Sequence, residues 1–160
     1  MIDLSQTFWS SDLAIPDLND DGVLPEGLHE CSLDEVIERF GQFSQSDRRR
    51  RLGQRLQEFL REVGSTRLAV AVIVDGSFVT GKREPNDIDL VLVLRAGHNF
   101  SEALRPFEYN VVSRRRVRKT FGFDMLLADE GQPELREYIA FFSQVRGNPD
   151  VRKGLLRVTL

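Results

Sequence analysis

Cysteine is nearly absent from this chain of 160 residues, which has a single one, Cys31. An intramolecular disulfide is therefore excluded, and a reducing, cytoplasmic location is expected. No apolar run approaches the roughly 20 residues needed to cross a bilayer, and the first residues lack the basic start and apolar stretch of a signal peptide. The two histidines have no cysteine at ligand spacing, so no zinc site is expected. These absences predict a protein without a membrane partner.

A strong excess of one charge is also lacking, because 25 acidic and 22 basic residues give a formal net charge of −3. The basic residues are unevenly distributed, however, with one run at 48–51 and a second at 114–119. A near-neutral total can hide local basic patches. Each run fits either a solvated helix face or a contact with phosphate or RNA, and the sequence leaves both interpretations open.

The hydrophobic pattern predicts one α/β (α+β) domain, a mixed β-sheet flanked by helices. Residues 1–31 are expected to form an irregular N-terminal arm packed on a domain of residues 32–160. Capping signals and apolar stripes at helical spacing predict most of the helices, and short apolar runs predict the strands. Helices are expected over 32–41, 46–64, 101–119 and 133–145, and strands over 68–74, 88–94, 121–127 and 155–160.

Three aspartates accompany the apolar strands and point to chemistry. Asp87 and Asp89 are two residues apart, so on a strand they share one face. Two like charges on a buried strand repel each other and lose hydration, a penalty that a divalent cation removes. Asp124 interrupts a later apolar run. If these strands are neighbours, the three carboxylates can hold two Mg²⁺ ions, or Mn²⁺, in a site suited to phosphoryl transfer.

The connection between the first two predicted strands contains residues suited to binding phosphate. Gly76 permits close backbone approach, and Ser77 adds a hydroxyl beside backbone N–H groups. Lys82 and Arg83 follow in the same connection and are expected to neutralise a triphosphate. Asp75, just before Gly76, could bind metal or face solvent, and of these two solvent exposure is expected.

The combination of these residues resembles the DNA polymerase β-type nucleotidyltransferase superfamily. A strand ending in Gly-Ser, an Asp-x-Asp on the next strand and a lone later aspartate match that pattern at Gly76, Ser77, Asp87, Asp89 and Asp124. In addition, segments 22–29 and 153–157 are similar to a bacterial family of short nucleotidyltransferase-like proteins. The resemblance implies a nucleotidyltransferase-like fold.

The resemblance also implies an activity. Asp87 and Asp89 would bind both metal ions, Asp124 would complete the acceptor-side metal and serve as base, and Gly76 and Ser77 would hold the triphosphate of an NTP such as ATP. The acceptor hydroxyl could belong to RNA, protein or a small molecule, and a partner protein or homodimer could supply nucleotide selection. The alternative is a catalytically inactive nucleotide- or RNA-binding module, or a toxin–antitoxin or defence component.

Overall fold

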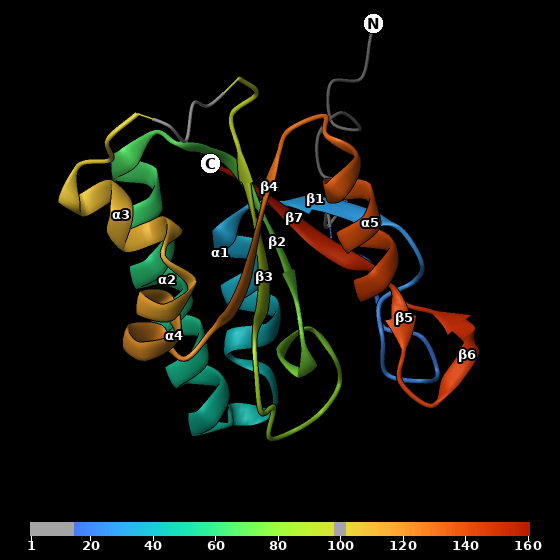
Figure 1. The fold of residues 1–160 in the computed structure, drawn as a ribbon. Coiled ribbons are helices and arrows are strands. Elements are labelled where there is room, and N and C mark those ends of the chain that lie inside the picture. Colours follow the sequence, from blue (N-terminus) through green and yellow to red (C-terminus); the bar gives the residue numbers. More distant parts are fainter. Residues whose placement is uncertain (1–14, 98–101) are drawn as a thin grey trace, which may run out of the picture.

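A computed structural model describes residues 15–97 and 102–160 of the chain. Its centre is a five-stranded sheet in the order β1-β7-β2-β3-β4 (Figure 1). The pairs β1–β7 and β3–β4 are parallel and the other two are antiparallel, which confirms the expected mixed sheet. The five strands are β1 (Leu28–Cys31), β2 (Ala69–Asp75), β3 (Asp89–Leu94), β4 (Asp124–Asp129) and β7 (Leu155–Thr159).

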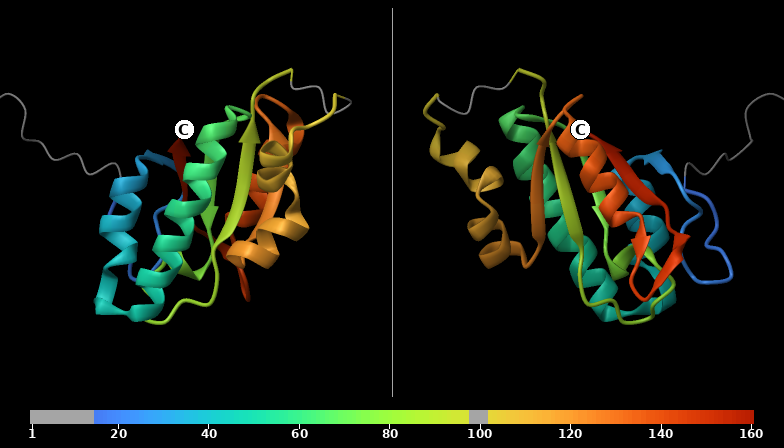
Figure 2. Two further views of the ribbon diagram at one scale, coloured as in Figure 1. Left: turned by 90° about the vertical axis from the view of Figure 1, so that its left-hand side faces the viewer. Right: turned by 45° about the vertical axis from the view of Figure 1, so that its right-hand side comes forward.

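Helices cover both faces of this sheet, as expected. Helices α1 to α4 lie on one face of the sheet, whereas α5 and a small hairpin lie on the other (Figure 2). The hairpin joins β5 (Gln144–Val145) to β6 (Asn148–Arg152). The helices are α1 (Leu33–Val36), η2 (Ile37–Gly41), η3 (Phe43–Gln45), α2 (Asp47–Thr66), η4 (Ser77–Val79), α3 (Pro106–Val112), α4 (Arg114–Phe121) and α5 (Pro133–Phe142).

The central strands are apolar on both faces because each face is covered. In β3, Leu90 and Leu92 belong to the core shared with α2, whereas Val91 and Val93 belong to the smaller core under α5. Successive side chains of a strand point to opposite faces, so these two sets alternate along β3. This double burial explains the continuous apolar run that predicted the strand.

The prediction of one helix over 101–119 is wrong within the described residues. Two helices, α3 and α4, meet there at Ser113, whose hydroxyl accepts a hydrogen bond from the backbone N–H of Arg116 and begins α4. Helix α4 then continues to Phe121, so the strand expected over 121–127 starts only at Asp124. The predicted helix over 133–145 likewise ends at Phe142, and the hairpin follows it.

The arm proposed for residues 1–31 is not irregular throughout. Residues 28–31 form β1, the edge strand paired with β7, and the side chains of Ile15 and Leu24 are buried in the main core. Residues 1–14 lie outside the described part of the chain. Among the residues that the structure describes, no helix combines the length and the apolar character needed to span a bilayer.

Candidate functional site

Three aspartates lie next to each other at one end of the sheet. Asp75 ends β2, Asp89 begins β3 and Asp124 begins β4. Asp75 is paired in register with Asp89, and Asp89 with Asp124. Directly paired residues on neighbouring strands point to the same face, and such strands are about 4.8 Å apart. We call Asp75, Asp89 and Asp124 the carboxylate row.

The carboxylate row belongs to the face of the sheet that α5 covers. Ile73 and Val91, each two residues from a member of the row, pack in the core under α5, and side chains two residues apart share a face. The structure therefore brings Asp89 and Asp124 together as predicted. It also adds Asp75, which was expected to face solvent.

Asp87 takes a different position from the one expected. It precedes β3 instead of lying on it, and Ser77 fixes its carboxylate. The backbone N–H of Ser77 donates to Asp87 Oδ1 at 2.8 Å, and the Ser77 hydroxyl donates to the same oxygen at 2.7 Å. The Ser77 hydroxyl also accepts a hydrogen bond from the backbone N–H of Asn86 at 2.8 Å. Ser77 thus orders the turn that carries Asp87.

Gly76 makes this arrangement possible. Its φ of +93° lies in the region that favours glycine. A Cβ at this position would lie 2.9 Å from the carbonyl oxygen of Asp87 and 3.0 Å from the backbone nitrogen of Asp89. From the sequence, this glycine was expected to permit close backbone approach to a phosphate. The observed close approach is to the backbone that carries the aspartates.

Asp75 does not face solvent, so that expectation is wrong. It is 3% exposed, and its two carboxylate oxygens accept hydrogen bonds from Lys153 Nζ at 2.8 and 3.0 Å. Lys153 lies between β6 and β7 and was not predicted as a site residue. A signal for it did exist, because a buried aspartate at the end of an apolar strand requires a positively charged partner.

The segments 22–29 and 153–157, which carried part of the family resemblance, pack against each other. The backbone N–H of Gly154 donates to the carbonyl oxygen of Leu24 at 2.8 Å. A Cβ on Gly154 would lie 2.1 Å from the carbonyl oxygen of Pro25, so no side chain fits there. This close packing fixes the backbone beside Lys153.

His29 takes part in the same packing and not in the site. Its Nε2 lies 2.7 Å from the carbonyl oxygen of Pro25, at hydrogen-bond distance. A Cβ on Gly154 would also lie 2.7 Å from this nitrogen. His29, the only histidine among the described residues, therefore has a structural role, since it packs against the loop that contains Lys153 and Gly154.

At the other end of the row, Asp124 is exposed and paired with Arg118 of α4. The two side chains are 63% and 68% exposed and form an ion pair. Exposed pairs of this kind contribute little to stability, about 0–1 kcal/mol. Burial therefore falls along the row, from Asp75 through the half-buried Asp89 to Asp124.

The electrostatics of the site centre on Asp89. Burial raises the pKa of Asp89 to about 6, and the charges of Asp87, Asp75 and Asp124 act in the same direction. Burial also raises the pKa of Asp75, although Lys153 opposes that effect. For Asp87, burial favours a higher pKa, but the hydrogen bonds from Ser77 outweigh it and keep the pKa below its usual value. Negative charge is thus concentrated around Asp89.

The donor set suits a hard divalent cation, because every titratable ligand in the site is a carboxylate. The side chains are not gathered as metal ligands, however. Within residues 15–97 and 102–160, no group of three or more carboxylate, histidine or cysteine side chains is arranged to hold a metal ion. Asp124 is engaged by Arg118, and Asp87 by Ser77. The residues therefore fit Mg²⁺ in chemistry and strand position, and a bound ion would require the Asp124 side chain to turn from Arg118.

One arginine of the first basic run, Arg49, is neither on a solvated helix face nor free to contact phosphate or RNA, the two roles considered for this run. Arg49 is 0% exposed, and its guanidinium donates to four backbone carbonyls. The acceptors Phe40, Phe78 and Thr80 lie at 3.1, 2.7 and 2.7 Å, and Lys82 is the fourth. Although burial lowers the pKa of Arg49 to about 10, the side chain stays charged at neutral pH. Arg49 therefore fixes the backbone of the loop that follows Ser77.

The two cations predicted to neutralise a triphosphate lie on this same loop. Lys82 and Arg83 are both exposed. Lys82 is close enough to Asp87 to lower the pKa of that carboxyl, although its effect is smaller than those of burial and of the hydrogen bonds from Ser77. The structure thus brings Lys82 to the Ser77–Asp87 turn and leaves Arg83 on the solvent side of the loop.

Two hollows on the described surface lie away from the carboxylate row. One is lined by Leu94, Leu127 and Asp129 at the opposite end of β3 and β4, and the other lies between η2 and α2. Neither is lined by any of the three aspartates of the row. The candidate site is therefore marked by its charge and its strand register, and not by these hollows.

Comparison with known proteins gives one match, to the model of a family described as a family of unknown function (DUF6932), over residues 16–159. The chain belongs to this family. The DUF6932 match spans both segments that pack around Gly154 and every aspartate of the site. No curated protein and no solved structure matches the chain.

Proposed function

We propose that this DUF6932 protein is a Mg²⁺-dependent nucleotidyltransferase, which transfers a nucleoside monophosphate from an NTP to an acceptor hydroxyl. The observation that carries the proposal is the register of Asp89 with Asp124, beside a Gly76-Ser77 turn that is hydrogen-bonded to Asp87. Carboxylates that begin adjacent strands suit the binding of a metal-bound triphosphate. This arrangement supports the resemblance to the DNA polymerase β-type superfamily.

The proposed reaction has a defined atom balance. The acceptor oxygen attacks the α-phosphorus of the NTP, a new P–O bond forms, and the bond to the β-phosphate oxygen breaks to release pyrophosphate. Asp124 would take the proton of the acceptor hydroxyl. Mg²⁺, when bound, would supply charge neutralisation for the triphosphate and a lower pKa for that hydroxyl. We also propose a cytoplasmic location, where NTPs are available.

Each residue of the site has a separate role in this proposal. Asp87 and Asp89 would hold the metal ions, and Ser77 would keep Asp87 charged and oriented through its two hydrogen bonds. Lys153 would pair with Asp75 and offset part of the repulsion that Asp75 adds to Asp89. Lys82 is available to contact the triphosphate.

A second candidate function is a catalytically inactive nucleotide- or RNA-binding module, or a component of a toxin–antitoxin or defence pair. The ion pair between Arg118 and Asp124 favours it, because this pair occupies the carboxylate that would complete the metal site. In such a module, Arg118 would remain on Asp124 when nucleotide binds. The two candidate functions therefore differ in whether Asp124 must leave Arg118 to bind a metal ion.

The test is incubation with α-³²P-labelled NTPs, Mg²⁺ or Mn²⁺, and separate pools of RNA, protein and small-molecule acceptors. Wild type should transfer label, whereas D87N/D89N and D124N should lose transfer by at least about 100-fold. The matched control is D129N, which removes a carboxylate from the opposite end of β4. Transfer by wild type and D129N alone supports the enzyme. Label transfer that persists in D87N/D89N, or is absent in wild type with every acceptor, excludes it.

Metal binding gives a readout that does not depend on turnover. Mg²⁺ should raise the melting temperature of wild type, because binding to the folded state stabilises it by mass action. The shift should be absent in D87N/D89N and unchanged in D129N. An equal shift in all three proteins would show that Mg²⁺ does not bind at these aspartates.

A further inference from the structure

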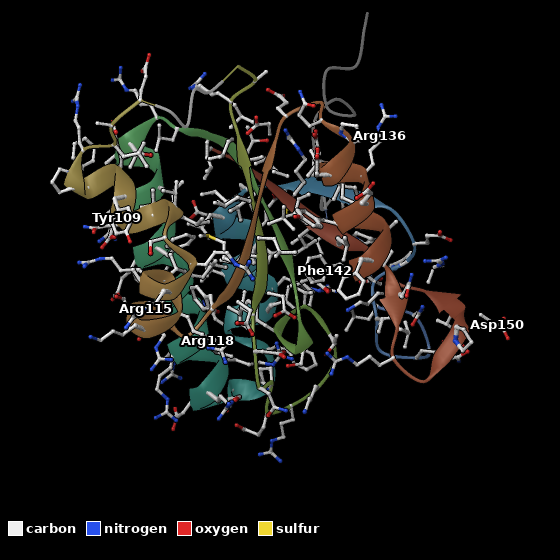
Figure 3. The ribbon with its side chains drawn as sticks, viewed as in Figure 1. Tyr109, Arg115, Arg118, Arg136, Phe142 and Asp150 are labelled. Atoms are coloured by element: carbon white, nitrogen blue, oxygen red, sulfur yellow. The ribbon has the colours of Figure 1, made fainter. Side chains whose placement is uncertain are left out.

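A surface of one charge adjoins the exposed end of the carboxylate row. Helix α4 has five basic residues among its eight and no acidic one, and all five basic side chains are exposed. We define the arginine surface as Arg51 and Arg55 of α2 together with Arg115 and Arg118 of α4. These two helices lie side by side on the same face of the sheet (Figures 1 and 3).

The arginine surface begins at the candidate site. Arg118 is paired with Asp124, the last member of the row. The guanidinium of Arg55 lies 3.6 Å from where a Cβ on Gly122 would be, two residues before Asp124. Arg51 lies four residues before Arg55, so both side chains share one face of α2. These contacts place cations from two helices around the start of β4.

The same surface continues away from the site toward exposed aromatic residues. Figure 3 shows Arg118, Arg115 and Tyr109 following one another along the outer side of α4 and α3. Tyr109 is 56% exposed and Phe107, also in α3, is 43% exposed. Arginines that bind phosphates and exposed aromatic rings that stack on bases are the two features that bind single-stranded nucleic acid.

The placement of the basic residues in α4 opposes helix stability. Three of them, Arg114 to Arg116, occupy the first turn of α4, where cations are unfavourable by about 0.3–1 kcal/mol each because of the helix dipole. The opposite bias holds in the loop 17–26, which has four acidic residues and no basic one. A surface that served only solubility would mix the two charges. The near-neutral total of the chain therefore conceals a strongly one-sided distribution.

We propose that the arginine surface binds a single-stranded nucleic acid and directs its hydroxyl end to the carboxylate row. The acceptor in the proposed transfer is then a nucleic acid strand and not a protein or a small molecule. Binding by this surface is independent of the proposed function, whereas the acceptor role rests on it. In the complex, phosphates replace Asp124 as the partners of Arg118.

The test begins with binding in EDTA, where no transfer can occur. The probe is a fluorescein-labelled 12-nucleotide single-stranded RNA, and its anisotropy is measured with wild type from 50 to 200 mM NaCl. The variant R51A/R55A/R115A should bind at least about tenfold more weakly. The slope of the logarithm of the binding constant against the logarithm of the salt concentration should be smaller in magnitude by about 2. Three arginines are removed, and each phosphate contact on a single strand contributes about 0.7.

A matched triple variant controls for net charge. R136A/R146A/R152A removes the same charge from α5 and the hairpin, on the face of the sheet opposite to α2 and α4, which is also the face of the carboxylate row (Figure 3). This variant should bind RNA as wild type does. Y109A should weaken binding about tenfold without changing the salt slope, because stacking releases no counterions. Unlabelled single-stranded DNA should compete for the same surface.

The outcomes separate this proposal from the proposed function. Equal weakening in both triple variants, or no RNA binding by wild type at 50 mM NaCl, overturns the nucleic-acid surface. Label transfer to protein or a small molecule that R51A/R55A/R115A retains overturns the acceptor role and leaves the nucleotidyltransferase standing. If wild type binds RNA but transfers no label, and only R51A/R55A/R115A loses RNA binding, the nucleic-acid surface is supported and the enzyme is excluded. Circular dichroism of each variant checks that it is folded.

Discussion

The two ends of the carboxylate row differ in almost every physical respect. Asp75 is buried, and its partner Lys153 is held beside a glycine that permits no side chain. Asp124 is exposed, and its partner Arg118 is an exposed side chain on a helix surface. Between them, Asp89 forms no ion pair with any of the described residues, and its pKa is raised, first by burial. One end of the row is therefore fixed by the fold, and the other can exchange partners.

This difference suggests how one row of like charges is tolerated. The fold neutralises the inner carboxylate permanently, because a buried charge must be paired. It leaves the outer carboxylate to solvent, where screening makes repulsion mild. The middle carboxylate carries a penalty that a bound cation would relieve. The following predictions test this contrast, beginning with the largest expected effect.

Breaking the inner pair should have the largest effect. K153M leaves Asp75 buried without its cationic partner, and we expect the free energy of unfolding to fall by about 3–5 kcal/mol at pH 7.5. Urea denaturation measures the loss. The double variant D75N/K153M should recover part of the stability, because no unpaired charge remains. A loss below about 1 kcal/mol in K153M would show that the inner pair is no more important than a surface pair.

The glycine beside Lys153 should be nearly as sensitive. G154A places a Cβ 2.1 Å from the carbonyl oxygen of Pro25, and we expect destabilisation of about 3 kcal/mol, at the upper end for overpacking. The control is G64A in α2, where no atom lies within 4 Å of the added Cβ. That variant should be stabilised by about 0.5–1 kcal/mol, since alanine favours helix over glycine. Similar urea midpoints for the two variants would contradict the prediction.

The middle of the row should respond in the opposite direction. Because the folded pKa of Asp89 is about 6 and its ordinary value is 3.8, ionisation of Asp89 destabilises the fold increasingly as pH rises from 3.8 to 6. D89N should therefore stabilise the metal-free protein by about 1–2 kcal/mol at pH 7.5, after allowance for solvent screening. At pH 5.0 the gain should be roughly half as large. Urea denaturation at both pH values gives the result, and a gain that is larger at pH 5.0 would contradict the sign.

Breaking the outer pair should have the smallest effect on stability. R118A removes the partner of an exposed carboxylate, and we expect a change within about 0.5 kcal/mol. If the proposed metal site is correct, the same variant should bind Mg²⁺ more tightly, because Asp124 no longer has to leave Arg118. Thermal unfolding with and without Mg²⁺ measures both effects. A loss of more than about 1.5 kcal/mol would show that the outer end is as fixed as the inner one.

Much of the fold follows from the sequence because its signals are local. The capping box at Ser32 and the serine at Ser46 begin helices as predicted, and the apolar runs form the central strands. Strand β1 could not be predicted in this way. Its four residues show no clear alternation, and only the long-range partner strand β7 makes them a strand.

The candidate site shows the same limit. The pattern of aspartates predicted that Asp89 and Asp124 would meet if their strands were neighbours, and the parallel register of β3 with β4 brings them together. The roles of Arg49 and Lys153 were missed because their partners lie about 30 and 78 residues away in the chain. A basic residue has the same local pattern whether it is solvated or buried against distant carbonyls. Burial of that kind is a tertiary property.

The interior position of β7 has a consequence for biosynthesis. β7 lies between β1 and β2 in the sheet, so residues 28–31 have no strand to join until residues 155–159 have been made. At about 5–20 residues per second, the roughly 120 intervening residues take on the order of 6–24 s to synthesise. Asp75 likewise has no ammonium partner until Lys153 leaves the ribosome. Neutralisation of the buried end of the carboxylate row must therefore wait until residue 153 has been synthesised.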